Sequence, residues 1–218
     1  AAHEPGVTTT SDRSVVMDSL GVSVAVGLYG ISFGAIATSS GLSIWQACAL
    51  SLLVFTGASP FAFVGVIGAG GSALTGAATA VLLGSRNMVY GIALAPRLQL
   101  PRRLRPAAAH VVIDESTAMA LTRPTRRQVR LGFFWTGLGV FTLWNLSTLL
   151  GAVAGETIGD PRTYGLDAAV GAAFLGLLWP RLTSGLHRTV ALRGAAVATG
   201  LVPVTPAGAP IIVGGAVA

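Results

Sequence analysis

The chain has 218 residues, of which only 10% are charged, and its mean hydropathy is +0.72. This composition excludes an ordinary soluble domain, in which about a quarter of the residues are charged. The net charge of +6 comes from fourteen Arg and no Lys. Most of these Arg residues lie in short loops between apolar stretches, so they indicate the cytoplasmic side of a membrane protein and not a nucleic-acid surface.

The beginning of the chain combines a polar tail with a long uncharged run. Residues 1–14 are polar and are expected to form a disordered tail, whereas 15–218 are predicted to form a single transmembrane domain. Between Ser19 and Ala95 the chain carries one charged side chain, Arg86. A soluble helix needs a polar face, but a bilayer removes that need. The sequence therefore predicts an all-α, polytopic transmembrane bundle with broken or re-entrant helices.

Three apolar stretches come first, at 15–40, 44–67 and 72–95. At 1.5 Å per residue, each is long enough to cross a hydrocarbon core of roughly 30 Å. A basic loop over 96–106 follows and is assigned to the cytoplasm. Three crossings before that loop would place the N-terminus outside the cell.

The segment at 107–122 lies between two basic loops and carries Asp114 and Glu115 at its centre. If both loops are cytoplasmic, this segment cannot cross the membrane, and it spans only roughly 24 Å as a helix. It is predicted to be a re-entrant or amphipathic element, held against protein or water. The remaining apolar stretches are 131–155, 165–179, 190–203 and 207–218. The last two are short and form either one broken span or two short ones.

A helix-breaking sequence lies inside the second apolar stretch. Pro60 lacks the N–H that would bond the Thr56 carbonyl, and its ring crowds that carbonyl. Gly57 and Ser59 loosen the same turn, so we expect a break near the membrane midplane that presents a free carbonyl and hydroxyls. Two interpretations remain open: a structural kink that neighbouring Ser and Thr side chains satisfy, or a substrate site.

Arg86 and Asn87 lie in the middle of the third stretch. A guanidinium at this depth is too far from either end to reach the interface easily, and it is costly unless paired or functional. Arg86 is expected either to bind a ligand carboxylate or act in a gate, or to form a structural ion pair with Asp114 or Glu115. These interpretations are compatible.

The two acids follow His110, which on a continuous helix would lie one turn before Asp114 and share its face. A carboxyl group in an apolar site can keep its proton near neutral pH, which suits proton coupling. The alternative for Asp114 and Glu115 is a solvated interfacial helix whose acids meet the neighbouring Arg loops.

Other polar and small residues favour structural roles. Asn145, beside Trp144 in the fourth span, is expected to bond a neighbouring helix. Asp167 is expected to cap the start of the fifth segment. Two glycine pairs have the spacing of close helix contacts: Gly30 with Gly34, and Gly151 with Gly155.

Several motifs occur in a fixed order along the chain: Gly-Ala-Ser-x-Phe-Ala at 57–62, a central Arg86 followed by Asn87 and by Tyr-Gly at 90–91, Asp-Glu-Ser at 114–116, Trp144, and Gly-Leu-Asp at 165–167. Over 27–180 this order resembles the AzlC family of branched-chain amino-acid permeases in bacterial plasma membranes. Two departures stand out. Pro60 replaces the usual Gln, and the family's Asn-x-Arg-His reads Gly84-Ser85-Arg86-Asn87 here.

The resemblance implies an exporter of hydrophobic amino acids that works with a small membrane subunit of the AzlD type. Enzyme signatures such as a phosphate loop, H-E-x-x-H or G-x-S-x-G are missing, and the three His have no metal-ligand spacing. We therefore expect neither an enzyme nor a cofactor. Without a nucleotide-binding motif, an ion or substrate gradient would drive transport.

The leading hypothesis is a secondary transporter with a mid-membrane site for a zwitterion. Arg86 is expected to bind the carboxylate, directly or through Asn87, while Asp114 or Glu115 senses protons or acts as the gate. The backbone around Thr56, Gly57 and Ser59 is expected to bind the ammonium group. The residues expected to line an apolar slot are Phe61, Phe63 and Trp144. The alternative is a membrane scaffold or assembly subunit that transports nothing.

Overall fold

The computed structural model describes residues 11–157, 175, 178, 179 and 182–217, and all regular structure in these ranges is helical. This confirms the predicted all-α class. The elements in chain order are α1 (Asp12–Gly27), α2 (Tyr29–Ser39), α3 (Ile44–Leu53), α4 (Ala58–Gly68), α5 (Ala73–Gly84), α6 (Arg86–Leu98), the 3-10 helix η1 (Arg102–Leu104), α7 (Arg105–His110), α8 (Asp114–Leu121), α9 (Arg126–Thr157), α11 (Gly185–Leu201) and α12 (Ala209–Val217).

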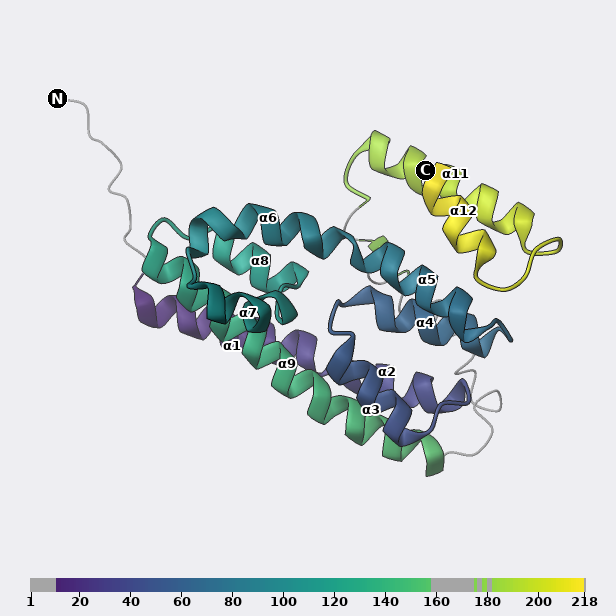
Figure 1. The fold of residues 1–218 in the computed structure, drawn as a ribbon, viewed down its shortest axis with the longest axis horizontal. Coiled ribbons are helices and arrows are strands. Elements are labelled where there is room, and N and C mark those ends of the chain that lie inside the picture. The colour runs from purple at the N-terminus through teal and green to yellow at the C-terminus, as the bar shows by residue number, and fades with distance from the viewer. Residues whose placement is uncertain (1–10, 158–174, 176–177, 180–181, 218) are drawn as a thin grey trace.

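Within the described part of the chain, three helical segments are long and apolar enough to cross a membrane (Figure 1): α1 with α2 over Asp12–Ser39, α5 with α6 over Ala73–Leu98, and α9. The protein is therefore a multi-pass membrane protein, as the composition predicts. The first of these segments begins at Asp12, where the Ser11 side chain accepts a hydrogen bond from the backbone N–H of Ser14. This N-cap starts the helix three residues before the apolar stretch.

The second apolar stretch does not cross, which corrects the predicted span at 44–67. It forms α3 and α4, separated by a break, and the end of α4 returns to the end of α2, where Gly68 lies against Ser40. Because α3 begins just after Ser40, the chain enters and leaves this layer at the same end of the molecule. The two helices together form a re-entrant pair.

The acidic segment forms a second re-entrant pair, α7 with α8, which enters from the opposite end. At that end Arg105 donates to the Leu100 carbonyl just before α7, and Arg97 donates to the Leu121 carbonyl where α8 finishes. The expectation of a re-entrant element at 107–122 is confirmed. A crossing segment followed by a re-entrant pair thus occurs twice, in opposite orientations.

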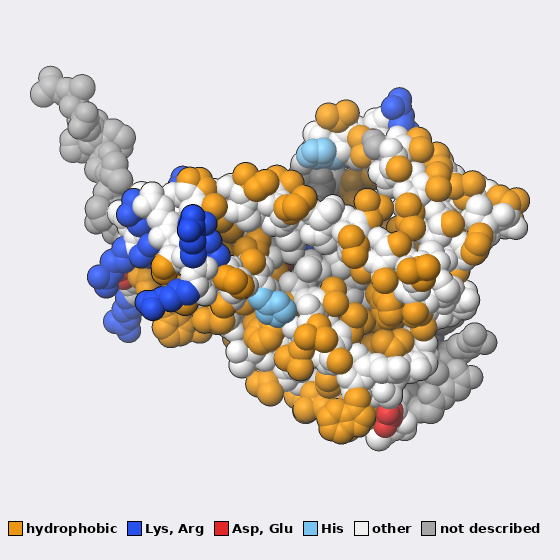
Figure 2. Space-filling view, in the orientation of Figure 1, with side chains coloured by type: hydrophobic (Ala, Val, Ile, Leu, Met, Phe, Trp, Pro, Cys, Tyr) orange, Lys and Arg blue, Asp and Glu red, His pale blue; other side chains and the backbone are white. Residues whose placement is uncertain are grey.

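Most of the described Arg side chains gather at the end where α1 and α9 begin, which Figure 2 shows as the blue cluster, whereas Arg86 lies at the central break and Arg188 and Arg193 lie on α11. Here Arg127 pairs with Asp12 at 2.6 Å and Arg123 pairs with Asp18 at 3.0 Å. We call this the basic end. The predicted placement of the N-terminus across the membrane from the basic loops is wrong, because α3 and α4 do not cross and only two crossings precede the first basic loop.

Helix α9 is the central support of the bundle and lies along both α1 and α2. The contact with α2 is close because glycine is present on both helices. A Cβ atom added at Gly34 would overlap the Thr148 carbonyl, and one added at Gly151 would overlap the Ile31 carbonyl. The glycine spacing at 30/34 and 151/155 therefore marks a true helix contact.

The C-terminal helices α11 and α12 pack on each other, and α12 also contacts α5. Of the two alternatives for 190–203 and 207–218, one broken span or two short elements, the structure has two separate helices packed on each other. The predicted fifth segment at 165–179 lies almost wholly outside the described residues, and so does Asp167.

Candidate functional site

Three helix interruptions meet at the middle of the bundle, and side chains from each contact the others. They are residues 54–57 between α3 and α4, Ser85 between α5 and α6, and residues 111–113 between α7 and α8. Asn87 donates from Nδ2 to the Val112 carbonyl at 2.9 Å, and His110 Nε2 lies 2.8 Å from the Leu52 carbonyl. A carbonyl only accepts, so this ring nitrogen carries the proton.

The first interruption has the cause that the sequence indicates. Pro60 is the third residue of α4 and cannot donate to Thr56, so the Thr56 carbonyl is left for another partner. Gly57 precedes α4 with φ +78° and ψ −98°, a conformation that a Cβ atom strongly disfavours. The freed Thr56 carbonyl accepts a bond from Arg86 Nη2 at 3.4 Å.

Arg86 also forms an ion pair with Asp114, with Nη2 and Oδ2 3.1 Å apart. The ion pair that the sequence offered for Arg86 is therefore present, and its acidic partner is Asp114. The two side chains keep 30% and 23% of their surface exposed. Since both face a cavity, the pair remains accessible to a small polar ligand.

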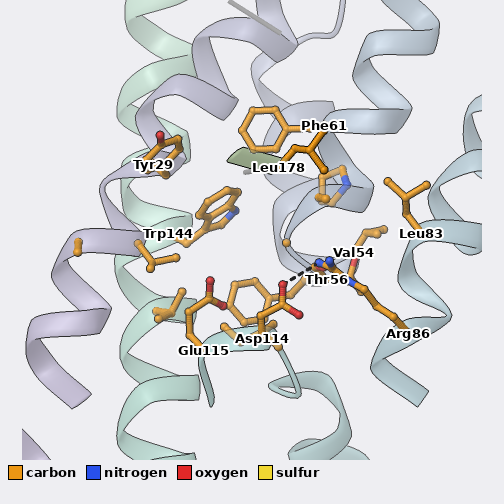
Figure 3. Close-up of a pocket in the computed structure, with 18 residues that line it drawn as sticks. Tyr29, Val54, Thr56, Phe61, Leu83, Arg86, Asp114, Glu115, Trp144 and Leu178 are labelled. Atoms are coloured by element: carbon orange, nitrogen blue, oxygen red, sulfur yellow. Dashed lines mark hydrogen bonds and ion pairs between the residues drawn. The ribbon is translucent and has the colours of Figure 1, made fainter. Parts of the chain in front are cut away.

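That cavity has a volume of about 540 Å³, within the ~300–1,000 Å³ of typical ligand pockets. As Figure 3 shows, Arg86, Asp114 and Glu115 lie at one end of it, and Tyr29, Phe61 and Trp144 lie toward the other. A charged end and an apolar end in one cavity match a small amphipathic ligand with a polar head.

The apolar end is a cluster of three packed rings. Phe33 is 5.2 Å from Phe61 and 5.9 Å from Trp144 between ring centroids, and Phe61 is 6.1 Å from Trp144. All three are at most 6% exposed, so this wall is rigid. Phe61 and Trp144 line the cavity as expected, but Phe63 does not, because it packs against Gly76 of α5.

Two other expected ligand residues, Ser59 and Asn87, lie beside the cavity and do not line it. Ser59 is 1% exposed, faces Gly84, and its hydroxyl has no hydrogen-bond partner among the described residues. Asn87 is held by its bond to Val112. Thr56, Gly57, Asp114 and Glu115 do line the cavity, and their role in binding stays a prediction.

His110 and Asp114 do not share a helix face, which corrects the sequence expectation. Helix α7 ends at His110 and α8 begins at Asp114, with residues 111–113 between them. The intervening Val111, Val112 and Ile113 are β-branched and favour extended backbone over helix. Asp114 therefore takes the first position of α8, where the helix dipole favours an acid.

Asn145 behaves as predicted and joins two helices. Its Oδ1 accepts a bond of 2.7 Å from the Ser51 hydroxyl of α3, and its Nδ2 donates to the Phe141 carbonyl.

Several lining residues carried no sequence signal, among them Tyr29, Leu83, Val140 and Leu178. They are ordinary apolar or aromatic positions on separate helices, and only the packing brings them together. Within the part of the chain that the structure describes, no group of three His, Cys, Asp or Glu side chains forms a metal site.

Comparison with known proteins identifies relatives across most of the chain. The sequence profile of the family described as AzlC protein matches residues 21–158. An uncharacterized membrane protein of Archaeoglobus fulgidus is 34% identical over 77% of this chain and 74% of its own length. The inner membrane protein YgaZ of Escherichia coli K12 is 28% identical over 76% of this chain and 67% of its own length. No solved structure matches the chain.

Proposed function

The chain belongs to the AzlC protein family, and from this premise we propose that it is a secondary transporter for branched-chain or other hydrophobic amino acids. The observation that carries the proposal is the Arg86–Asp114 pair facing a cavity with a rigid aromatic wall. A transporter-like role in the membrane follows from the family and the fold; the substrate, direction and coupling are the proposal.

The substrate carboxylate binds between Arg86 and the first turn of α4. Helix α4 begins at Ala58 beside Gly57 in the cavity wall, so its unbonded N–H groups and positive dipole end add to the guanidinium charge. The ammonium group lies near the carboxylates of α8. This replaces the expectation that the backbone at Thr56–Ser59 binds it, because the positive end of α4 favours an anion there. The aliphatic side chain contacts Phe61 and Trp144.

Binding alters the ion pair, because a substrate carboxylate that bonds Arg86 competes with Asp114 for the same guanidinium. We propose that Asp114 or Glu115 couples this exchange to protons and that a proton gradient drives export, the direction that resemblance to the family implies. The small AzlD-type membrane subunit belongs to this proposal on the same ground.

Counterflow of labelled leucine into liposomes that contain the purified protein tests the proposal. Asp114→Asn should change the pH dependence of the rate, and Arg86→Gln should abolish uptake while the protein still inserts. Arg126→Gln, at an exposed Arg of the basic end, is the matched control. Full uptake by the Arg86 variant would remove this residue from the mechanism. The assay is run with and without a co-expressed small membrane subunit.

A scaffold that transports nothing is the second candidate, because Arg86 Nη2 already pairs with Asp114 and bonds the Thr56 carbonyl. A scaffold would assemble with a partner and would show no counterflow of leucine under any condition. A membrane enzyme has less support. The Ser59 hydroxyl bonds to no group in the described residues, so no dyad of Ser59 with His110 forms.

A further inference from the structure

A second cavity, of about 460 Å³, lies between α6 and α7 and is independent of the proposed transport site. Its floor is apolar and buried, formed by Leu94 and Leu98 of α6, Ala108 of α7 and Phe133 of α9. Met88 and Ile92 on its rim are both 70% exposed. The cavity is thus a groove open to the outside of the bundle, and we call it the α6–α7 groove.

The α6–α7 groove has the length of one lipid leaflet. It runs along α6 from Asn87, beside the central helix breaks, to Leu98 near the basic end. The eleven steps of helix from Asn87 to Leu98 extend about 16 Å, and half of a hydrocarbon core is about 15 Å. An acyl chain of the leaflet at the basic end therefore fits along its whole length.

A guanidinium closes the groove at its surface end. Arg105 lines the groove there and donates from Nε to the Leu100 carbonyl, which fixes the position of its head. Neither Nη atom of Arg105 has a hydrogen bond to any group in the described part of the chain. Arg102 and Arg103 of η1 are exposed just before it. None of the described residues that line the groove is acidic.

We propose that the α6–α7 groove binds an anionic phospholipid, with one acyl chain against Leu94 and Leu98 and the phosphate on Arg105. Basic pockets between helices on the cytoplasmic side suit such head groups. Among the described residues of the lining, Asn87 and Arg105 are the only polar ones and none matches an ammonium group, so a free amino acid is a poor occupant. The bound chain fills the gap between α6 and α7.

Native mass spectrometry of the detergent-purified protein tests this site without any transport assay. The protein is titrated with phosphatidylglycerol or phosphatidylcholine that carry identical dioleoyl chains. The wild type should bind one phosphatidylglycerol in preference to phosphatidylcholine. The Arg105→Gln variant should bind phosphatidylglycerol about fivefold more weakly than the wild type. One basic residue near an anionic head group contributes about 1 kcal/mol of binding free energy, which corresponds to this change in Kd.

Gly91→Leu blocks the groove itself. No protein atom lies within 4 Å of a Cβ placed on Gly91, so the added side chain occupies the groove and not the protein interior. Excluding even two methylene groups of the lipid weakens binding about fifteenfold. Gly21→Leu on α1 is the matched control, because a Cβ there also meets nothing within 4 Å, and its lipid binding should equal that of the wild type.

Three results would overturn the proposal. The first is wild-type binding of phosphatidylglycerol by the Gly91 variant while its thermal unfolding is normal. The second is equal binding of the two lipids in both the wild type and the Arg105 variant. The third is a small membrane protein that co-purifies and occupies the groove in place of lipid. None of these bears on whether the central cavity transports amino acids.

Discussion

The Arg86–Asp114 pair allows the structural role and the proposed transport role of Arg86 to be measured separately. Arg86→Gln removes the cation that pairs with Asp114, and Asp114→Asn removes the carboxylate that pairs with Arg86. The double variant places two neutral amides opposite each other and removes both charges of the pair. Stability and transport should therefore respond differently to the second substitution.

The magnitude follows from the exposure of the pair. Breaking a fully buried pair costs about 3–5 kcal/mol and an exposed pair is worth about 0.2–1 kcal/mol. With side chains 30% and 23% exposed, each single substitution should lower the free energy of unfolding by about 2 kcal/mol. The double variant should lose less than the sum of the two, with a coupling energy of about 1–2 kcal/mol.

Unfolding of the purified protein in mixed micelles with increasing SDS, followed by tryptophan fluorescence, measures the three variants. Leucine counterflow in liposomes is measured on the same preparations. The stability of the double variant should be partly restored, but its transport should remain absent because the substrate carboxylate has no cation. Transport by the double variant at the wild-type rate would refute the assignment of Arg86. A coupling energy near zero would refute the ion pair.

Three further predictions concern packing, selectivity and topology. Gly151→Ala should lower the free energy of unfolding by about 1–3 kcal/mol, since its Cβ overlaps α2. The control Gly21→Ala should not lower it, and equal stability of the two variants would contradict the α2–α9 contact. Trp144→Ala should raise the KM for leucine roughly tenfold more than the KM for alanine, and equal changes would show that Trp144 does not contact the aliphatic chain. In a background without the native cysteine, Ser14→Cys and Thr125→Cys should react with an impermeant maleimide from the same side of the membrane, and labelling from opposite sides would show that the N-terminus does not lie at the basic end.

The break between α3 and α4 could be predicted because its cause is local. A proline without a donor and a glycine with positive φ interrupt a helix in any surroundings. An ion pair of Arg86 with an acid could also be predicted, since a cation at membrane depth needs a partner. Within the acidic segment, the β-branched residues 111–113 were a local signal for the break between α7 and α8. This break separates His110 from Asp114.

The return of α4 to its starting end could not be predicted from composition. A crossing helix and a re-entrant pair have the same length and hydropathy when both are buried, so the stretch at 44–67 is ambiguous by itself. The difference lies in contacts between distant residues, such as Gly68 against Ser40. The cavity lining has the same origin, because Tyr29, Leu83 and Val140 come together only after the helices pack.

The two re-entrant pairs give the site its position and its symmetry. One enters beside Ser40 and the other from the basic end, so α4 and α8 both begin at mid-depth, next to Arg86. Inverted repeats of this kind place binding sites at the midplane, where one half can move against the other. Under the proposed transport, Arg86 bonds both halves, through Thr56 on one and Asp114 on the other. A substrate that takes this guanidinium loosens both contacts together, which couples binding to the movement of the halves.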